Sequence, residues 1–264
     1  MKKKTFFLKG YIIIKNVIPK KLILDLQNSF SFDKSKKSSS SDCYKKFLSN
    51  VKKNKNTNFD FVKPFHEISI YRGFYDKLFS IKRISSKLNE LLGPDLAYLD
   101  DPSFTLNISG LNDQKKNYHF KKFHQEMWSG ANTSTLVFWS PIFLPSNKSG
   151  QLSIIKESHL WGLIPNNNKE PTRLPSKYKK IDINLNIGDV IIFHPLLLHA
   201  TNPITAKNKS ARLSLVTSIR NFKNINSSYD LLKNWKIFSM SEATLIEKKL
   251  GNHYLTPYRT KLLD

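Results

Sequence analysis

The sequence predicts a mainly β fold with flanking helices, arranged as an antiparallel sandwich or barrel. After Pro94, short apolar or alternating runs follow one another between turn residues, which is typical of antiparallel strands. Towards both ends of the chain, apolar residues recur at helical spacing instead. Because the 264 residues contain no internal repeat and suffice for one sizeable core, we expect a single domain over 1–264. Its expected parts are helical support over 1–93, a β core over 95–222 and C-terminal helices over 227–250.

The N-terminal third predicts one strand and several helices. Residues 6–17 are β-branched and aromatic and predict a short strand, and residues 18–30 then predict a helix. Ser39–Asp42 would cap a short helix over 44–53. Residues 66–93 carry apolar residues at helical spacing and end at a glycine, which is typical of one or two helices.

The β core is predicted from six short runs of apolar or alternating residues. These runs span 103–109, 123–128, 134–144, 150–158, 183–194 and 211–220. In the tail, 228–238 and 241–250 return to helical spacing, with Ser241 as the N-cap and Gly251 just past the end.

The chain carries an unusual excess of positive charge. It has 43 Lys and Arg against 20 Asp and Glu, a formal net charge of +23. Such a charge suits nucleic acid, a membrane surface or an anionic substrate, or it reflects a lysine-rich composition spread over a solvated surface. We favour the last explanation, with an anionic substrate as its main exception. The lysines are scattered, and they mostly replace the arginine that nucleic-acid-binding proteins prefer.

The composition also excludes several classes of protein. No apolar run approaches the roughly 20 residues of a membrane-spanning helix, so we expect no membrane partner. Lys9 and Lys15 interrupt the apolar residues near the N-terminus, which argues against a signal peptide. The single cysteine, Cys43, excludes an internal disulfide framework and a cysteine-based metal cluster. We therefore expect a cytoplasmic protein.

The spacing of the seven histidines singles out candidate metal ligands. His124 and Glu126 stand two residues apart, which places both side chains on one face of an extended strand and Gln125 on the other. One further histidine would complete the two-histidine, one-carboxylate set that binds non-haem Fe(II) and leaves three positions open. His194 and His199 are both candidates. His199 is favoured because it stands where a strand gives way to a polar loop, whereas His194 is more easily explained as structural.

A second pattern follows 13 residues after His199. Residues 211–222 alternate with a period of two, so Arg212 and Ser214 share one face of a predicted strand. Burying an arginine is unfavourable unless it meets an anion, and its planar fork suits a carboxylate, with the Ser214 hydroxyl as a further partner. Considered alone, Arg212 is explained slightly better by an ordinary salt bridge at a sheet surface.

Taken together, the order of these residues resembles a known family. His124-X-Glu126, His199 about 70 residues later and Arg212-X-Ser214 resemble the phytanoyl-CoA dioxygenase-like family of Fe(II)/2-oxoglutarate oxygenases. The opening strand and helix, the FHQEMW segment and the segments from STLVFW to SHLWG and from NIGDV to HATNP are similar as well. The resemblance covers about 5–30 and 95–222.

The resemblance implies a double-stranded β-helix core, also called a cupin-like jelly roll. It implies an oxygenase that uses Fe(II), 2-oxoglutarate and O₂. The implied metal ligands, which would also be catalytic, are His124, Glu126 and His199. The implied 2-oxoglutarate site has five residues: Arg212, which would hold the distal carboxylate, Ser214, Thr201, Trp139 and Asn107.

Three positions depart from the pattern of the family. Glu126 stands where the family usually has aspartate, one methylene shorter, so the metal should still bind with a slight shift. Halogenases of this superfamily lack the carboxylate altogether, so Glu126 favours hydroxylation. Phe123 replaces a common tryptophan, which bears on the substrate rather than on the cofactor. His159 follows Glu-Ser where the family has Gly-Ser, and we expect it to be structural.

We therefore expect hydroxylation of an unactivated C–H bond in a small molecule, with an anionic substrate as one option. A non-oxidative, cupin-type metal protein is the first alternative, but it would not need Arg212 or Trp139. A nucleic-acid demethylase is the second, yet that group expects two arginines six residues apart, whereas Arg212 and Arg220 are eight apart. Nucleic acid is therefore not expected as a partner. Segments 31–58 and 112–122 are either lid elements or ordinary surface.

Overall fold

The computed structural model describes seven ranges of the chain: 3–29, 39–53, 73–99, 103–109, 122–205, 210–224 and 235–249. Its centre is a seven-stranded antiparallel sheet with the order β1-β9-β4-β11-β2-β12, in which β3 also pairs with β11. These strands are β1 (Tyr11–Ile14), β2 (Leu96–Leu99), β3 (Ser103–Ile108), β4 (Thr135–Phe143), β9 (Val190–Phe193), β11 (Ala211–Asn221) and β12 (Trp235–Ser239).

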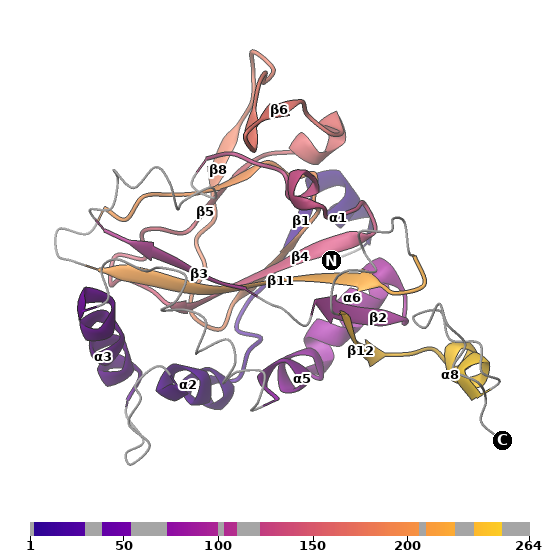
Figure 1. Ribbon diagram of the computed structural model, residues 1–264, viewed down its shortest axis with the longest axis horizontal. Helices are drawn as coiled ribbons and strands as arrows, with labels where there is room; N and C mark the ends of the chain where they lie inside the picture. The colour runs from indigo at the N-terminus through magenta and orange to yellow at the C-terminus, as the bar shows by residue number, and fades with distance from the viewer. Residues whose placement is uncertain are drawn as a thin grey trace.

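A smaller antiparallel sheet faces the large one, as the position of β5 and β8 above the long strands shows (Figure 1). It has the order β10-β5-β8, formed by β10 (His199–Thr201), β5 (Leu152–Ile155) and β8 (Lys180–Asp182). A two-stranded pair, β6 (Asn166–Asn167) and β7 (Glu170–Pro171), lies in the connection from β5 to β8. The predicted mainly β fold with flanking helices is confirmed.

Alternation along the strands of the large sheet separates two apolar cores. Leu136 and Phe138 of β4 pack into the core on the side of the helices. Val137 and Trp139, the residues between and after them, pack into the core between the two sheets. Because successive side chains of a strand point to opposite faces, a single strand contributes to both cores. We call the face that carries Val137 and Trp139 the inner face of the large sheet, because it packs against the smaller sheet.

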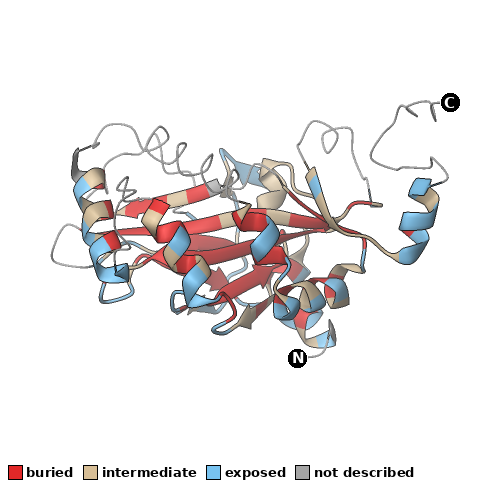
Figure 2. Cartoon of the chain, turned by 90° about the horizontal axis from the view of Figure 1, so that it is seen from below, coloured by how far each residue is buried: buried red, intermediate tan, exposed pale blue. Residues whose placement is uncertain are grey.

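Helices cover the other face of the large sheet. Figure 1 shows α2 (Lys20–Ser29), α3 (Ser40–Lys53) and α5 (Phe74–Phe79) below the long strands, and α6 (Lys82–Leu92) follows α5. Buried residues gather in the strands, whereas the helices present exposed residues to the outside (Figure 2). No helix of the described ranges is both long and apolar enough to cross a membrane.

The predicted helix ends are confirmed where the structure describes them. The Ser39 hydroxyl accepts a hydrogen bond of 3.2 Å from the Asp42 N–H at the start of α3. Gly93 follows α6 with φ 86°, a backbone conformation that favours glycine. The Ser241 hydroxyl accepts a hydrogen bond of 3.2 Å from the Thr244 N–H at the start of α8 (Glu242–Lys249).

Two predicted elements were wrong. Residues 6–9 belong to a helix, α1 (Lys3–Lys9), and the strand begins only at Tyr11. Phe6 is buried against the helical core, and this packing outweighs the β preference of its aromatic neighbours. Residues 235–238 form a strand rather than a helix, because they pair with β2 and extend the large sheet. The segment therefore forms an edge strand of the large sheet.

One predicted strand is shorter than expected, and several predictions cannot be placed. The run 123–128 gives way to a 3₁₀ helix, η1 (Glu126–Ser129). The following predictions lie outside the described residues: the start of the 66–93 helices, the 227–234 part of the C-terminal helices, Gly251, most of the 112–122 segment and the two ends of the 31–58 segment. The middle of the last segment is α3.

A buried carboxylate joins β1 to the turn before β9. Asp189 accepts hydrogen bonds from the N–H groups of Asn16 (2.7 Å) and Asn186 (2.9 Å) and from the Lys15 ammonium (3.0 Å). Burial raises the pKa of Asp189, but these donors outweigh it and hold the pKa below its usual value. The turn therefore pins the edge strand of the large sheet.

Candidate functional site

Three side chains from two segments that are far apart in the sequence meet at one point. The ligand atoms offered by His124, Glu126 and His199 all lie within 4.8 Å of one another. Glu126 Oε1 lies 3.6 Å from His124 Nε2 and 3.2 Å from His199 Nε2. Both histidines are buried, whereas about a fifth of the Glu126 side chain (21%) is exposed. The predicted ligand set therefore forms one compact group.

Backbone pairing brings the two ligand segments together. The His124 N–H donates to the His199 carbonyl (3.0 Å), and the His199 N–H donates to the His124 carbonyl (3.1 Å). Gln125 is extended, with φ −110° and ψ 138°, so Glu126, the first residue of η1, returns to the face of His124. The Glu126 N–H donates to the Pro195 carbonyl at 2.9 Å, which ties its backbone to the turn before β10.

Both imidazoles are oriented by backbone carbonyl groups. His124 Nδ1 lies 2.9 Å from the Lys122 carbonyl oxygen, and His199 Nδ1 lies 3.0 Å from the Leu197 carbonyl oxygen. Because a carbonyl only accepts hydrogen bonds, each Nδ1 is assigned the hydrogen and each Nε2 keeps its lone pair. The two Nε2 atoms are those that face Glu126. A ring nitrogen held in this way is the usual form of a metal-binding histidine.

The charge state of the group suits a divalent metal ion. Burial raises the pKa of Glu126, but the hydrogen bonds and charges that the two histidines supply when they are protonated outweigh it and hold the pKa well below its usual range. Burial lowers the pKa of His199, and the charge of His124 lowers it further. Glu126 is therefore ionised and His199 neutral near pH 7. Two imidazole nitrogens and one carboxylate oxygen are the donor set of non-haem Fe(II) sites.

A buried arginine lies on the inner face of the large sheet. Arg212 is 1% exposed, and its guanidinium donates hydrogen bonds to the hydroxyls of Ser214 and Thr105, the latter at 3.2 Å. The two hydroxyl oxygens lie 2.6 Å apart. Arg212 Cζ also lies 5.6 Å from the centroid of the Trp139 ring. The strand thus presents a positioned cation and hydroxyl groups, which is the chemistry that binds a carboxylate.

Two further predicted site residues are Asn107, which lies on β3, and Thr201, which ends β10. Asn107 stands opposite Arg212 in the pairing of β3 with β11. Its Nδ2 donates to the carbonyl groups of Gly150 (3.3 Å) and Asn202 (3.0 Å), so its amide also ties β3 to two loops. Thr201 follows His199 by two residues on β10, and it pairs with Leu152.

His194 lies outside the group of ligand atoms. Its ring centroid is 5.6 Å from that of His159, and its Nδ1 accepts a hydrogen bond from the Leu196 N–H at 3.2 Å. Burial, and then the charge of His159, lowers the pKa of His194 to about 4. His159 Nε2 in turn donates to the Phe7 carbonyl at 2.8 Å. His159 thus contacts α1, and His194 stabilises the turn before β10.

Sequence reasoning missed two residues of the site region. Thr105 contacts Arg212, and the alternation of polar Thr105 and Asn107 with apolar Phe104 and Leu106 was the signal that could have found it. Gln125 was placed on the face opposite the ligands, but its contacts could not be read from the sequence. They depend on loops that pack against it only in the fold.

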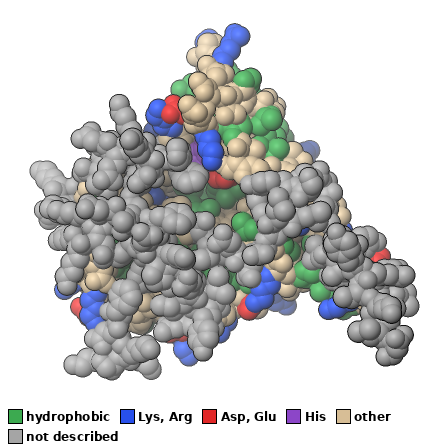
Figure 3. All heavy atoms as spheres, viewed as in Figure 1, with side chains coloured by type: hydrophobic (Ala, Val, Ile, Leu, Met, Phe, Trp, Pro, Cys, Tyr) green, Lys and Arg blue, Asp and Glu red, His purple; other side chains and the backbone are tan. Residues whose placement is uncertain are grey.

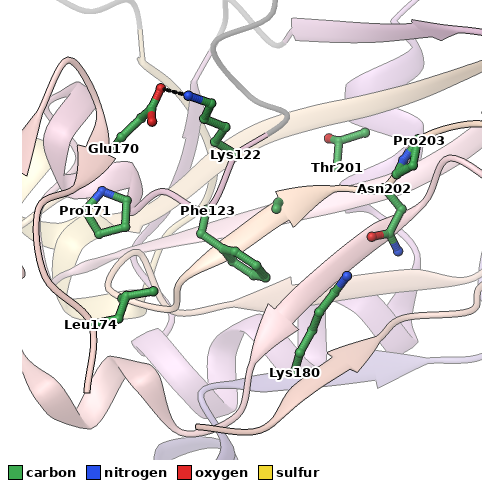
Figure 4. Close-up of a pocket in the computed structure, with 10 residues that line it drawn as sticks. Lys122, Phe123, Glu170, Pro171, Leu174, Lys180, Thr201, Asn202 and Pro203 are labelled. Carbon is green, nitrogen blue, oxygen red and sulfur yellow. Dashed lines mark hydrogen bonds and ion pairs between the residues drawn. The ribbon is translucent and has the colours of Figure 1, made fainter. Parts of the chain in front are cut away.

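A pocket of about 370 Å³ lies beside the segments that carry the ligands (Figure 4). Its lining includes Phe123, which precedes His124, and Ala200, Thr201 and Asn202, which follow His199 in the sequence. The other lining residues include Leu174 and Pro171 on the apolar side and Lys180 and the Lys122–Glu170 ion pair on the polar side. Thr201, a predicted 2-oxoglutarate residue, is therefore part of the wall of this pocket.

Comparison with known proteins assigns the family. The family model for phytanoyl-CoA dioxygenase (PhyH) matches residues 6–212. The chain belongs to the PhyH family. None of the curated protein sequences matches this PhyH chain. The predicted resemblance is thus confirmed over most of the chain.

Solved structures confirm the predicted jelly-roll fold of the PhyH chain. The non-heme monooxygenase ThoJ is similar with a TM-score of 0.59 and 13% identity, over 91% of this chain and 84% of its own. EctD from S. alaskensis, solved with 2-oxoglutarate and 5-hydroxyectoine, gives 0.53 and 16%, over 91% and 79%. The alpha-ketoglutarate-dependent epimerase SnoN from nogalamycin biosynthesis gives 0.52 and 13%, over 83% and 81%. At these identities the likeness concerns the fold alone.

Proposed function

We propose that this PhyH protein is an Fe(II)- and 2-oxoglutarate-dependent oxygenase that hydroxylates an unactivated C–H bond of a small molecule, releasing succinate and CO₂. One observation carries the proposal. A group of two imidazole nitrogens and a carboxylate oxygen within 4.8 Å lies in the same jelly roll as a buried arginine with hydroxyl partners. The first feature suits Fe(II), and the second suits the distal carboxylate of 2-oxoglutarate.

Each residue has a definite part in this proposal. His124, Glu126 and His199 would hold the iron, which together with 2-oxoglutarate and O₂ supplies the oxidising power of the reaction. The residues that would hold 2-oxoglutarate are Arg212, Ser214, Thr201, Trp139 and Asn107. Thr105 would keep the Arg212 fork in place through its hydroxyl.

The apolar core between the sheets supports the same proposal. Trp139, Phe193 and Leu197 belong to the buried cluster on the inner side, and the Phe193 ring centroid lies 4.7 Å from that of His199. These side chains exclude water from one side of the ligand group. Exclusion of water strengthens the pairing of Arg212 with a carboxylate and protects reactive species from side reactions.

A small molecule is the substrate class that we propose, with an anionic one as an option. The net charge of +23 favours anions in the neighbourhood of the protein. The Lys and Arg side chains of the described residues that can be seen in Figure 3 lie apart from one another on this face. SnoN and EctD were solved with small molecules, nogalamycin RO and 5-hydroxyectoine. We also propose a cytoplasmic location and a single domain over 1–264.

The placement of Arg220 argues against a nucleic-acid demethylase. Its Cζ lies 4.1 Å from the centroid of the Trp235 ring, at the end of β11 away from Arg212. The two arginines therefore do not converge on one ligand. A different oxidative outcome is the second candidate, because SnoN, an epimerase, has a similar fold.

Anaerobic addition of Fe(II) and then 2-oxoglutarate tests the proposal. A weak visible charge-transfer band should develop in the wild-type protein and be lost in His199→Ala and Arg212→Ala. His194→Ala, a histidine outside the ligand group, should keep the band. Absence of the band from the wild-type protein would overturn the proposal. Substrate-dependent succinate formation over a panel of anionic and neutral metabolites then separates hydroxylation from epimerisation by the product formed.

A further inference from the structure

We infer that Gln125 is a positioning residue that sets the geometry of the metal ligands by joining three chain segments behind them. The inference rests on the proposed function in so far as His124, Glu126 and His199 bind a metal. Gln125 stands between two of these ligands in the sequence, and its side chain points to the opposite face. It is 0% exposed.

Both the nitrogen and the oxygen of the Gln125 carboxamide form hydrogen bonds. Its Nε2 donates to the carbonyl groups of Leu196 (2.7 Å) and Gly162 (2.9 Å). Its Oε1 accepts a hydrogen bond of 2.9 Å from the Ile164 N–H. A buried amide with three such bonds cannot rotate without leaving a buried backbone group unsatisfied.

The segments joined in this way carry or support the ligands. Leu196 belongs to the turn before β10, three residues from His199, and the neighbouring Pro195 carbonyl accepts the Glu126 N–H. Gly162 and Ile164 belong to the connection from β5 to β8, in which Ile164 packs with Ile155 of β5 and Leu198 in one buried cluster. Gln125 therefore links the 124–126 segment to the turn that presents the third ligand.

Other contacts reinforce the same junction. Trp128 Nε1 donates to the Ile164 carbonyl at 3.0 Å, and the Leu198 N–H donates to the Ser158 hydroxyl at 2.8 Å. Both bonds run from the ligand segments to the same covering connection. The distance between His124 and His199 thus depends on a polar junction at their back as well as on the strand pairing between them.

The chain contains a natural control for this role. Gln151 is 2% exposed and makes the same set of bonds: Nε2 donates to the carbonyl groups of Lys148 (3.0 Å) and Leu185 (3.1 Å), and Oε1 accepts from the Leu185 N–H (2.9 Å). Its side chain joins the turn after β4 to the segment before β9. Replacing either side chain removes equivalent buried bonds. The side chain of Gln125 is bonded to the turn that presents His199, whereas the side-chain bonds of Gln151 reach Lys148 and Leu185, and its bond to Asn202 is made by the backbone carbonyl that a substitution keeps.

The experiment compares Gln125→Met with Gln151→Met in the metal-free protein and during titration with Co(II). Both variants should show a similar fall in Tm when no metal is present. Gln125→Met should bind Co(II) about 10- to 100-fold more weakly than wild type, with a changed visible absorption spectrum, because supporting contacts of ligands have effects of this size. Gln151→Met should keep the affinity and the spectrum.

Three results would overturn the inference. Unchanged Co(II) affinity and spectrum in Gln125→Met would remove the positioning role and leave the proposed function intact. Equal weakening in both variants would show general loosening of the fold. A wild-type protein that binds no Co(II) would overturn the metal site itself. If Gln125→Met does not fold, Gln125→Glu and Gln151→Glu replace the pair, since glutamate keeps the acceptor and loses both donors.

Discussion

The two faces of the large sheet are both buried, yet they bury different chemistry. On the helical side, β11 contributes Leu213, Leu215 and Ile219 to an apolar core. On the inner side, the same strand contributes Arg212 and Ser214, joined by hydrogen bonds. The outer face gains stability from removing apolar surface from water, whereas the inner face holds a desolvated cation.

The difference teaches that one strand can support the fold and the site at the same time. Period-two alternation separates the two tasks, so a substitution should affect one far more than the other. Changes on the helical face should lower the free energy of unfolding and leave ligand affinity unchanged, and changes of the inner-face residues that belong to the site should do the reverse. The predictions below test this separation.

Loss of a ligand should have the largest effect. Glu126→Ala removes the carboxylate from the group, and we expect metal affinity to fall by more than about 100-fold, since even supporting contacts of ligands account for about 10- to 100-fold. Titration with Co(II) measures the affinity. The metal-free Tm should stay near that of wild type, because Glu126 lies at the edge of the site and is partly exposed. Collapse of the fold in this variant would contradict the separation.

Removal of a core side chain on the outer face should act in the opposite way. Phe138 is fully buried and lies edge-to-face against Phe79 with ring centroids 5.5 Å apart. Phe138→Ala should lower the free energy of unfolding by about 3–5 kcal/mol, as measured by urea denaturation. The fraction that remains folded should bind Co(II) with wild-type affinity. Weakened metal binding would show that the two faces are coupled.

The two buried arginines of β11 sharpen the comparison within the inner face. Arg212→Met should weaken 2-oxoglutarate binding about 10- to 100-fold, because a charge-assisted hydrogen bond contributes about 1.5–3 kcal/mol. Arg220→Met should keep this affinity and instead lower the free energy of unfolding by about 1–2 kcal/mol, through loss of its contact with Trp235. The charge-transfer band reports the first quantity and urea denaturation the second. Equal effects on binding would contradict the assignment of the arginines.

The smallest effect concerns the pH dependence of stability at the edge of the large sheet. The folded-state pKa of Asp189 lies below the ordinary aspartate value of 3.8, so its stabilising contribution is present above that value and is lost as the pH falls through the folded pKa. Asp189→Asn should lower the free energy of unfolding by about 1–3 kcal/mol near pH 7. Its stability should also change less than that of wild type between pH 5 and pH 3, measured by denaturation at each pH. Identical pH profiles would remove Asp189 as the cause.

Much of the site could be predicted because it depends on local spacing. His124 and Glu126 share a face whenever Gln125 is extended, and Arg212 and Ser214 share a face of any strand. The third ligand was favoured for its position at a strand end, and the structure places His199, not His194, in the ligand group. The parts taken by individual residues in binding iron and 2-oxoglutarate remain predictions.

The elements that were wrong were those whose environment outweighs their local preference. Residues 6–9 have aromatic and apolar character that suits a strand, but burial of Phe6 against the helical core favours α1. Residues 235–238 have helical spacing, but pairing with β2 provides hydrogen bonds to a neighbouring strand instead. Neither neighbour can be identified from the segments themselves.

Sequence alone was sufficient for the fold class, the family resemblance and the set of candidate ligands, because alternation, turn residues and motif order are properties of neighbouring positions. Tertiary structure was needed for everything that depends on distant segments: the approach of His199 to His124, the hydroxyl of Thr105 beside Arg212, and the three bonds of Gln125. A side chain's face follows from the backbone period of its own strand. Its partners depend on which strands and loops are folded against that face.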